Sequence, residues 1–173
     1  MNKCYWVTGL SATGKTTLSS LLVTHLRGQG KTVIHLDGDD LRQVLADEIY
    51  AREDRIALAM RYARLCKLLT EQGLDIVIAV IGLFKEVHKW NRENITNYIE
   101  IFIDTPLSEL KKRDPKKIYR DFELGLINNV AGIDLKIDIP SNPDIYLKWS
   151  EKSTIDSMFN ELVKSIENRV DII

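Results

Sequence analysis

Residues 9–16 of this 173-residue chain read Gly-Leu-Ser-Ala-Thr-Gly-Lys-Thr, which is the spacing of a phosphate-binding loop. An apolar run at 4–8 precedes the loop and a helical pattern at 17–26 follows it, and the motif requires this strand–loop–helix context. The glycines let backbone N–H groups turn toward phosphate oxygens, and the positive end of the following helix adds to that field. A glycine-rich turn with a surface lysine is the alternative, which the flanking strand and helix disfavour. The motif therefore predicts nucleoside triphosphate binding.

Two residues of the loop carry specific chemistry. Lys15 is expected to reach the β- and γ-phosphates, and the hydroxyl of Thr16 is expected to ligate Mg²⁺.

A second group of polar residues follows the next apolar run. Asp37 and Asp39 flank a glycine, and Arg42 lies one turn further along. Two such carboxylates can hold a metal-bound water and orient an acceptor hydroxyl, and Arg42 can bind an acceptor's phosphate. Asp39 is also a candidate N-cap for a helix that begins at Asp40, and one residue can serve both purposes. Alone, Arg42 would be an ordinary surface arginine.

These residues need a scaffold, and strand-like and helix-like segments alternate along the chain, which is typical of a parallel sheet with helices on both faces. The predicted strands are 3–8, 32–37, 75–81, 99–104 and 145–149, the first four of them read as buried on both sides. The predicted helices are 15–27, 39–47, 53–72, 86–94, 106–113 and 154–168, with a short helical pattern at 117–124. We expect one α/β domain over residues 1–173, a three-layer α/β/α sandwich of the P-loop NTPase type with about five mainly parallel strands.

The segment 113–143 differs from the rest. It is charged and is interrupted by prolines and glycines. In an enzyme that transfers phosphoryl groups, a long segment of this kind often forms a lid that excludes water. A surface loop without function is the alternative.

The composition limits the partners and the cellular compartment that we expect. Lys and Arg number 24 against 25 Asp and Glu, a net charge of −1, so no basic field indicates nucleic acid as a partner. Cys4 and Cys66 are expected to be buried free thiols, as in a reducing compartment. The chain opens on a strand without a signal peptide, and its longest apolar stretch, 76–83, is too short to span a bilayer. We expect a cytoplasmic protein with no membrane partner.

The three histidines are interpreted as structural. His35, in the second predicted strand, is expected to be a core histidine, and His25 and His88 are expected on helix surfaces.

Several motifs together resemble the adenylylsulfate (APS) kinases. They are Gly-Leu-Ser-x-x-Gly-Lys-Thr-Thr at 9–17, Leu-Asp-Gly-Asp-Asp-Leu-Arg at 36–42, Asp-Thr-Pro-Leu at 104–107, Arg-Asp-Pro-Lys at 113–116 and Gly-Ile-Asp at 132–134. The resemblance runs from Trp6 to about Leu147. It implies transfer of the γ-phosphate of ATP to the 3′-hydroxyl of a ribose, in a nucleotide that carries an activated acidic group. It also implies a possible homodimer.

The resemblance implies a role for each matching residue. Lys15, Asp37 and Asp39 would be catalytic, and Thr16 and Asp37 would serve the metal. The ATP phosphates would be held by Gly9, Ser11, Ala12, Thr13, Gly14, Lys15, Thr16 and Thr17. The acceptor would be bound by Asp39, Arg42, Tyr50, Arg55, Leu58, Gly82, Phe84, Lys116 and Val130, with Tyr50 stacking on its base.

Three departures from the family pattern lie on the acceptor side. Leu58 stands where the family has asparagine, Gly82 where it often has serine, and Val130 where it commonly has phenylalanine. They indicate a changed acceptor, and we lean toward cytidine 5′-diphosphoramidate, the acceptor of a capsule-biosynthesis branch. APS itself, a catalytically silent ATP-binding module and a kinase of a non-nucleotide metabolite are the alternatives. Leu58 also shares a helical face with Tyr62, so it can instead be a core residue.

Overall fold

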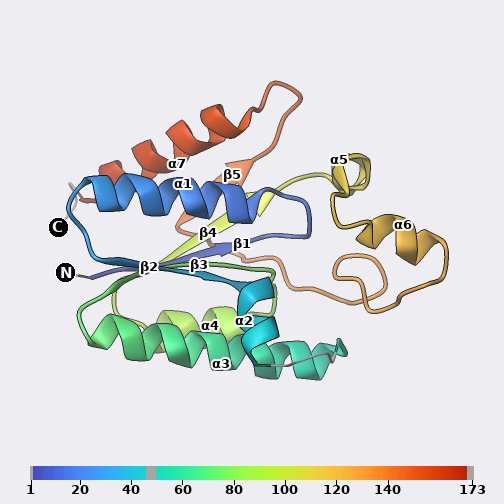
Figure 1. Cartoon of the computed structure of the whole chain (residues 1–173), viewed down its shortest axis with the longest axis horizontal. Coiled ribbons are helices and arrows are strands. Elements are labelled where there is room, and N and C mark those ends of the chain that lie inside the picture. The colour runs from blue at the N-terminus through green and yellow to red at the C-terminus, as the bar shows by residue number, and fades with distance from the viewer. Residues whose placement is uncertain (1, 46–49, 171–173) are drawn as a thin grey trace.

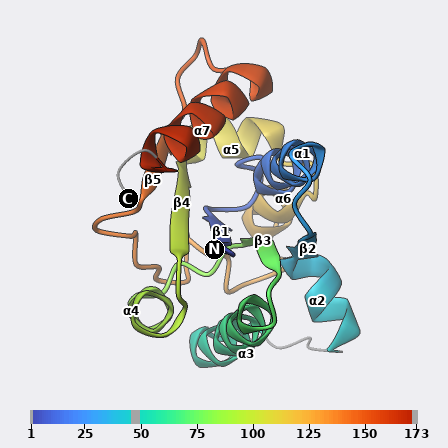
Figure 2. The ribbon, with the colours of Figure 1, turned by 90° about the vertical axis from the view of Figure 1, so that its left-hand side faces the viewer.

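The computed structural model describes residues 2–45 and 50–170. Its five strands form one parallel sheet, in which the strand that leads into the phosphate loop is central (Figure 2). The strands are β1 (Cys4–Thr8), β2 (Val33–Asp37), β3 (Asp75–Val80), β4 (Tyr98–Asp104) and β5 (Ile145–Lys148), in the order β2-β3-β1-β4-β5. The predicted α/β fold class with a parallel, five-stranded sheet is confirmed.

Helices cover both faces of the sheet. They are α1 (Lys15–Gly28), α2 (Gly38–Val44), α3 (Arg52–Glu71), α4 (Lys85–Asn94), α5 (Leu107–Arg113), α6 (Ile118–Glu123) and α7 (Ile155–Val170). Figure 1 shows α1 and α7 on one face and α3 and α4 on the other. Each predicted helix appears with its ends shifted by a few residues, except that part of the second predicted helix, 46–47, lies outside the described residues.

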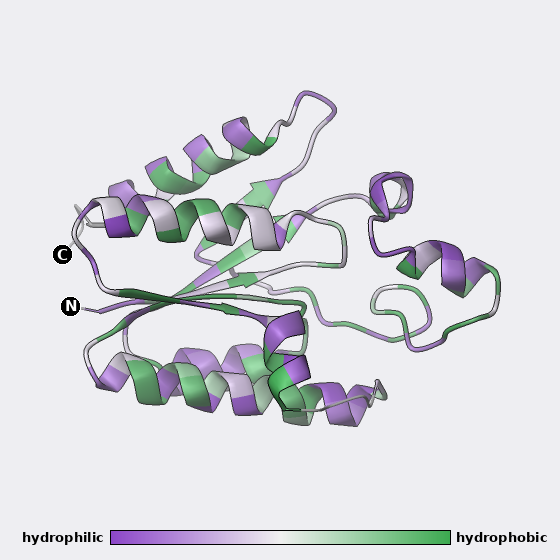
Figure 3. Cartoon of the chain, in the orientation of Figure 1, coloured by the Kyte–Doolittle hydropathy of each residue, from purple (hydrophilic) through white to green (hydrophobic). Residues whose placement is uncertain are grey.

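The central strand packs into both layers because its side chains alternate. Tyr5 and Val7 join the core beneath α1 and α7, while Cys4 and Trp6 join the core beneath α3. Figure 3 shows the strands mainly in the hydrophobic colour, between helices of mixed colour. Cys4 and Cys66 are buried and free, as expected.

The second strand departs from its prediction. Of the residues in β2 only Val33 is buried, whereas β1 and β3 are buried throughout. β2 pairs with β3 alone and is therefore an edge strand, so its apolar sequence does not imply burial on both sides.

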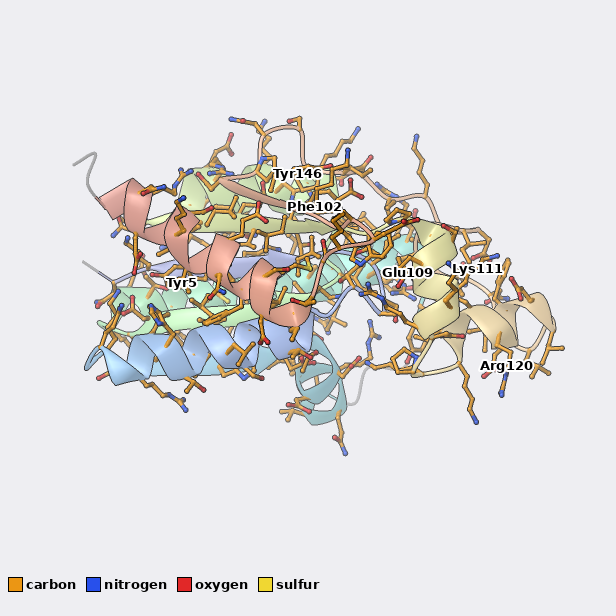
Figure 4. All side chains as sticks on the ribbon, turned by 90° about the horizontal axis from the view of Figure 1, so that it is seen from above. Tyr5, Phe102, Glu109, Lys111, Arg120 and Tyr146 are labelled. Carbon is orange, nitrogen blue, oxygen red and sulfur yellow. The ribbon has the colours of Figure 1, made fainter. Side chains whose placement is uncertain are left out.

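The segment predicted as a lid lies beyond the carboxyl ends of the strands, with α5 and α6 at that end of the molecule (Figure 1). Its own small core contains Leu110, Tyr119 and Val130. Lys111 of α5 donates to Glu123 of α6 over 2.7 Å, and Figure 4 shows Lys111 and Arg120 at the end of the molecule away from Tyr5. In the described part of the chain, no helix has the length and apolarity needed to cross a membrane.

Candidate active site

The loop between β1 and α1 has the backbone of a phosphate cradle. A Cβ atom on Gly9 would lie 2.7 Å from the carbonyl oxygen of Ile103, so only glycine fits there. Gly14 has a φ of 92°, in the region that favours glycine, and Ala12 has a φ of 65°. These turns bring the loop back to the N-terminus of α1, where free backbone N–H groups and the helix dipole attract anions.

Lys15 contacts the loop itself. Its ammonium group donates to the carbonyl oxygen of Leu10 over 2.6 Å, and the hydroxyl of Thr13 donates to the same oxygen over 3.0 Å. The pKa of Lys15 is lowered to about 8, mainly by burial and then by the charge of Lys116, while the charges of Asp37 and Asp39 oppose the shift. A phosphate oxygen in place of the carbonyl would supply the negative charge that the buried ammonium lacks.

Asp37 joins the two halves of the site. One of its carboxylate oxygens accepts from the Thr16 hydroxyl over 2.8 Å, and the other accepts from the backbone N–H of Asp39 over 2.9 Å. Asp37 is therefore the N-cap of α2, and the sequence interpretation that gave this role to Asp39 is wrong. The helix begins at Gly38, two residues earlier than Asp40, because the strand ends directly in the cap.

The donor set at this point suits a magnesium ion. The hydroxyl of Thr16 and the carboxylate of Asp37 are hard oxygen ligands, which Mg²⁺ prefers. Within residues 2–45 and 50–170 no three acidic, histidine or cysteine side chains gather as a complete metal site. Mg²⁺ that is bound through one or two protein oxygens, phosphates and water needs no such cluster.

The lid segment contacts both halves. The ammonium group of Lys116 contacts the carboxylate of Asp39, and the hydroxyl of Tyr119 donates to the carbonyl oxygen of Ser11 over 2.9 Å. Gly132 lies so close to Leu10 that a Cβ atom on it would be 2.9 Å from that side chain. The lid is thus docked on the phosphate loop.

A cationic group lies beside α2 and the start of α3. The guanidinium groups of Arg42 and Arg55 lie 4.6 and 5.1 Å from the centre of the Tyr50 ring. Arg55 donates to the carbonyl oxygens of Tyr50 over 3.0 Å and Asn129 over 2.9 Å. Burial, and then the charge of Arg42, lower the pKa of Arg55. The hydrogen-bond acceptors of Arg55 are these two neutral carbonyl oxygens, while the charge of nearby Asp134 partly offsets the lowering of its pKa.

Three residues predicted to bind the acceptor have buried side chains. Leu58 and Phe84 are each 2% exposed and belong to the core beneath α3 and α4. Val130 is 5% exposed and packs in the small core of the lid. These side chains pack against the protein itself, so the structure corrects their prediction as direct ligand contacts. Leu58 follows the apolar face of its helix into the core, as the alternative interpretation held.

Gly82 also has a local explanation. Its φ is 46°, and a Cβ atom there would lie 3.1 Å from the Trp6 ring. The backbone conformation and the close Trp6 ring therefore favour a glycine at position 82, whatever the acceptor is.

Sequence reasoning missed a residue that positions the backbone next to Arg55. Asp134 accepts the backbone N–H groups of Asn129 over 2.8 Å and Val130 over 2.6 Å, and so turns the Asn129 carbonyl toward Arg55. The φ of Asn129, 58°, is one that asparagine tolerates. The Gly-Ile-Asp motif was the available signal for Asp134.

A second missed cluster anchors the end of the lid. Asp138 accepts from Arg52 over 2.8 Å and from the backbone N–H of Lys85 over 3.3 Å. His88 bonds Glu100 over 2.7 Å and is only 12% exposed, so its prediction as a surface histidine is wrong.

Comparisons with known proteins agree with this geometry. Residues 1–148 match the family model described as adenylylsulphate kinase. The chain is 34% identical over 161 residues to cytidine diphosphoramidate kinase of Campylobacter jejuni, covering 93% of this chain and 94% of that protein. It is 43% identical over 143 residues to adenylyl-sulfate kinase of Pseudomonas aeruginosa, covering 81% and 73%.

A solved structure, the Mycobacterium tuberculosis APS kinase CysC in complex with AMPPNP and APS, superposes with a TM-score of 0.87. It is 31% identical and covers 96% of this chain and 98% of its own. The matched residues 1–148 contain the phosphate loop, the paired aspartates and the lid segment. This chain therefore belongs to the adenylylsulphate kinase family.

Proposed function

We propose that this protein is an ATP- and Mg²⁺-dependent kinase that phosphorylates the ribose 3′-hydroxyl of a small 5′-modified nucleotide, with cytidine 5′-diphosphoramidate as the preferred acceptor. The observation that carries the proposal is the pairing of two sites. The phosphate loop with Thr16 and Asp37 faces the donor, and Asp39 with the Arg42–Tyr50–Arg55 group faces an acidic acceptor.

The chain's own residues divide the work of transfer. Backbone N–H groups of the loop and Lys15 hold the donor phosphates, while Thr16 and Asp37 would hold the metal. The metal, when bound, neutralises charge that develops on the phosphates. Asp39 accepts the proton of the 3′-hydroxyl or orients it, and its carboxylate can do so while Lys116 contacts one of its two oxygens. Because phosphoryl transfer needs mainly positioning and positive charge, this set suffices.

The acceptor's acidic side is assigned to the arginines. Arg55 is partly buried and bonded only to carbonyl oxygens among the described residues, so an anion would relieve its desolvation. A base that stacks on Tyr50 must share the ring with two guanidinium groups. Both candidate acceptors carry an anionic group on the 5′ side, so this feature supports the class of acceptor.

The choice between the two acceptors rests on other support. The Campylobacter jejuni relative matches almost end to end, at 93% of this chain and 94% of its own. The Pseudomonas aeruginosa relative has a higher identity, 43%, over a shorter part of the chain. Adenylylsulfate is therefore the second candidate acceptor.

The deciding experiment compares kcat/KM for the two acceptors with saturating Mg·ATP. We expect cytidine diphosphoramidate to be preferred by about tenfold or more, since one or two contacts to a base differ by roughly 1–3 kcal/mol. A preference for adenylylsulfate would show that the proposed acceptor is wrong and would leave the proposed kinase activity standing. ATP binding without transfer to either nucleotide would favour the silent module. Lys15→Ala, which removes the cation at the donor phosphates, is the control for both reactions.

A further inference from the structure

Helix α1 and strand β2 meet through a ladder of polar contacts, which we call the α1–β2 ladder. Its first rung is Thr16 to Asp37, 2.8 Å, and its second is Ser19 to Nε2 of His35, 3.0 Å. The third is the Arg27 guanidinium to the carbonyl oxygen of Val33, 2.8 Å.

The ladder follows from two periodicities. Side chains three apart lie on one face of a helix, and side chains two apart lie on one face of a strand. Thr16 and Ser19 therefore project from the same face of α1, and His35 and Asp37 from the same face of β2. The packing agrees, because Val33 joins the core beneath α1 while Ile34 and Leu36 pack against the opposite core.

The Ser19 hydroxyl has two partners in the second rung. Its oxygen lies 3.0 Å from the carbonyl oxygen of Thr16 and 3.0 Å from Nε2 of His35. When the hydroxyl donates to the Thr16 carbonyl, its oxygen accepts from Nε2 of His35, which then carries a proton. Ser19 thus links the His35 ring to the backbone of Thr16.

The two rungs differ in their exposure to water. Ser19 is 0% exposed, whereas the Thr16–Asp37 bond lies at the surface. Water competes for an exposed hydrogen bond, so the Thr16–Asp37 bond by itself holds its two side chains only weakly in place. The second rung is partly buried and lies one turn further along the helix, where less water competes for it.

We propose that Ser19 and His35 are positioning residues of the metal site: their partly buried bond sets the register of α1 on β2 and holds the Thr16 hydroxyl against Asp37. This rests on the proposed use of Mg²⁺ with ATP. Outer partners that orient metal ligands contribute about 10- to 100-fold to metal affinity.

The test measures metal coupling in donor binding. A non-hydrolysable ATP analogue is titrated by calorimetry, once with Mg²⁺ and once with EDTA, and the ratio of the two Kd values is the coupling. In Ser19→Ala and His35→Leu we expect the ratio to fall by about tenfold, with the Kd in EDTA changed by no more than about twofold. His35→Gln, which keeps an N–H donor, should restore most of the ratio.

Ser20→Ala is the matched control, because it removes an exposed hydroxyl from the neighbouring position of α1. It should leave both Kd values unchanged. If one of the two ladder variants melts too low for titration, the other decides. A lowered ratio in that variant, with a ratio close to that of the unaltered protein in His35→Gln, supports the bond.

Two outcomes would overturn the proposal. One is an unchanged ratio in folded Ser19→Ala, and the other is a rise of both Kd values by the same factor, which would mean that the rung supports the loop as a whole. Failure of the proposed function would look different. No binding of the analogue by the unaltered protein would contradict the donor site, and absence of transfer to nucleotides would leave the coupling measurable.

Discussion

At the scale of single residues, Lys15 shows how a local environment prepares a side chain for its ligand. The ammonium group is held by the Leu10 carbonyl, and burial lowers its pKa to about 8. Donor phosphates favour the charged form, so nucleotide binding raises this pKa again. Above pH 8 the complex then binds more protons than the free protein.

The first prediction concerns this proton. At about pH 9, nucleotide binding takes up a proton at Lys15, and affinity falls as the pH rises above about 8, whereas at about pH 7 the lysine is charged in both states and contributes no uptake. Calorimetry in two buffers of different ionisation enthalpy measures the uptake. Lys15→Arg, which stays protonated, should abolish it, and uptake that persists in this variant would assign the proton elsewhere.

The second prediction concerns Arg55. Its guanidinium forks between the carbonyls of Tyr50 and Asn129, which lysine cannot reproduce. Arg55→Lys should lower kcat/KM for the acceptor by roughly 10- to 100-fold, the loss of a charged hydrogen bond worth about 1.5–3 kcal/mol, with the KM for ATP unchanged. Arg64→Ala, an exposed arginine of the same helix, is the control. An equal rise of the KM for ATP would place Arg55 on the donor side.

At the scale of elements, the lid segment is docked on the phosphate loop by a hydrogen bond and by apolar packing against Leu10 and Ala12. Tyr119 is 1% exposed, and its hydroxyl reaches across to the Ser11 carbonyl. Its ring packs with Leu110 and Val130 and keeps that packing when the hydroxyl is removed. The hydroxyl therefore reports on lid docking separately from lid folding.

The third prediction follows from this contact. Tyr119→Phe should cost about 0.5–1.5 kcal/mol of unfolding free energy and should speed tryptic cleavage after Lys116 and Lys117. Urea unfolding and timed proteolysis measure the two effects. Tyr146→Phe is the matched control, because that hydroxyl bonds Asp104 on the sheet and not the lid (Figure 4). Equal cleavage rates in the two variants would contradict docking through Tyr119.

The fourth prediction concerns Val130, which packs within the same lid core. Val130→Phe inserts a ring into a site that is 5% exposed, so it should destabilise the protein by about 1–3 kcal/mol through overpacking. Thermal and urea unfolding measure this. A variant as stable as the unaltered protein, with a changed acceptor preference, would restore Val130 to the acceptor site.

At the scale of the whole molecule, the proposed donor site joins elements that are distant in sequence. The phosphate loop follows β1, Asp37 is the last residue of β2, and the lid segment follows β4 by way of α5. All three lie at the carboxyl end of one sheet (Figure 1). A ligand that contacts all three stabilises the fold by mass action.

The fifth prediction measures that linkage. Mg·ATP at about 100 times its Kd should stabilise the protein by about 2.7 kcal/mol, which raises the Tm by roughly 5–10 °C for a chain of this size. Thermal unfolding with and without the nucleotide tests it. Lys15→Ala should lose the rise, and a rise that survives in this variant would mean that the nucleotide binds outside the loop.

The sequence by itself determined the order of the elements, the parallel sheet and the phosphate loop. These depend on local patterns, because strand and helix periodicities and a glycine's freedom act over a few residues. The positions of Lys15, Asp37 and Asp39 near one another also followed, since the carboxyl ends of parallel strands share one edge. The family resemblance then indicated which residues bind the acceptor nucleotide, but it did not give the contacts of these residues within the protein.

Only the tertiary structure decided which of the predicted site residues are buried within the protein and which contacts hold the others. Leu58 and Phe84 turn into the core, Arg55 is held by a carbonyl 74 positions away, and His88 finds Glu100 on another element. Such contacts depend on how faces pack across large sequence separations, which no local pattern records. The ladder from Ser19 and His35 to the metal side has the same origin, because its rungs exist only once α1 lies on β2.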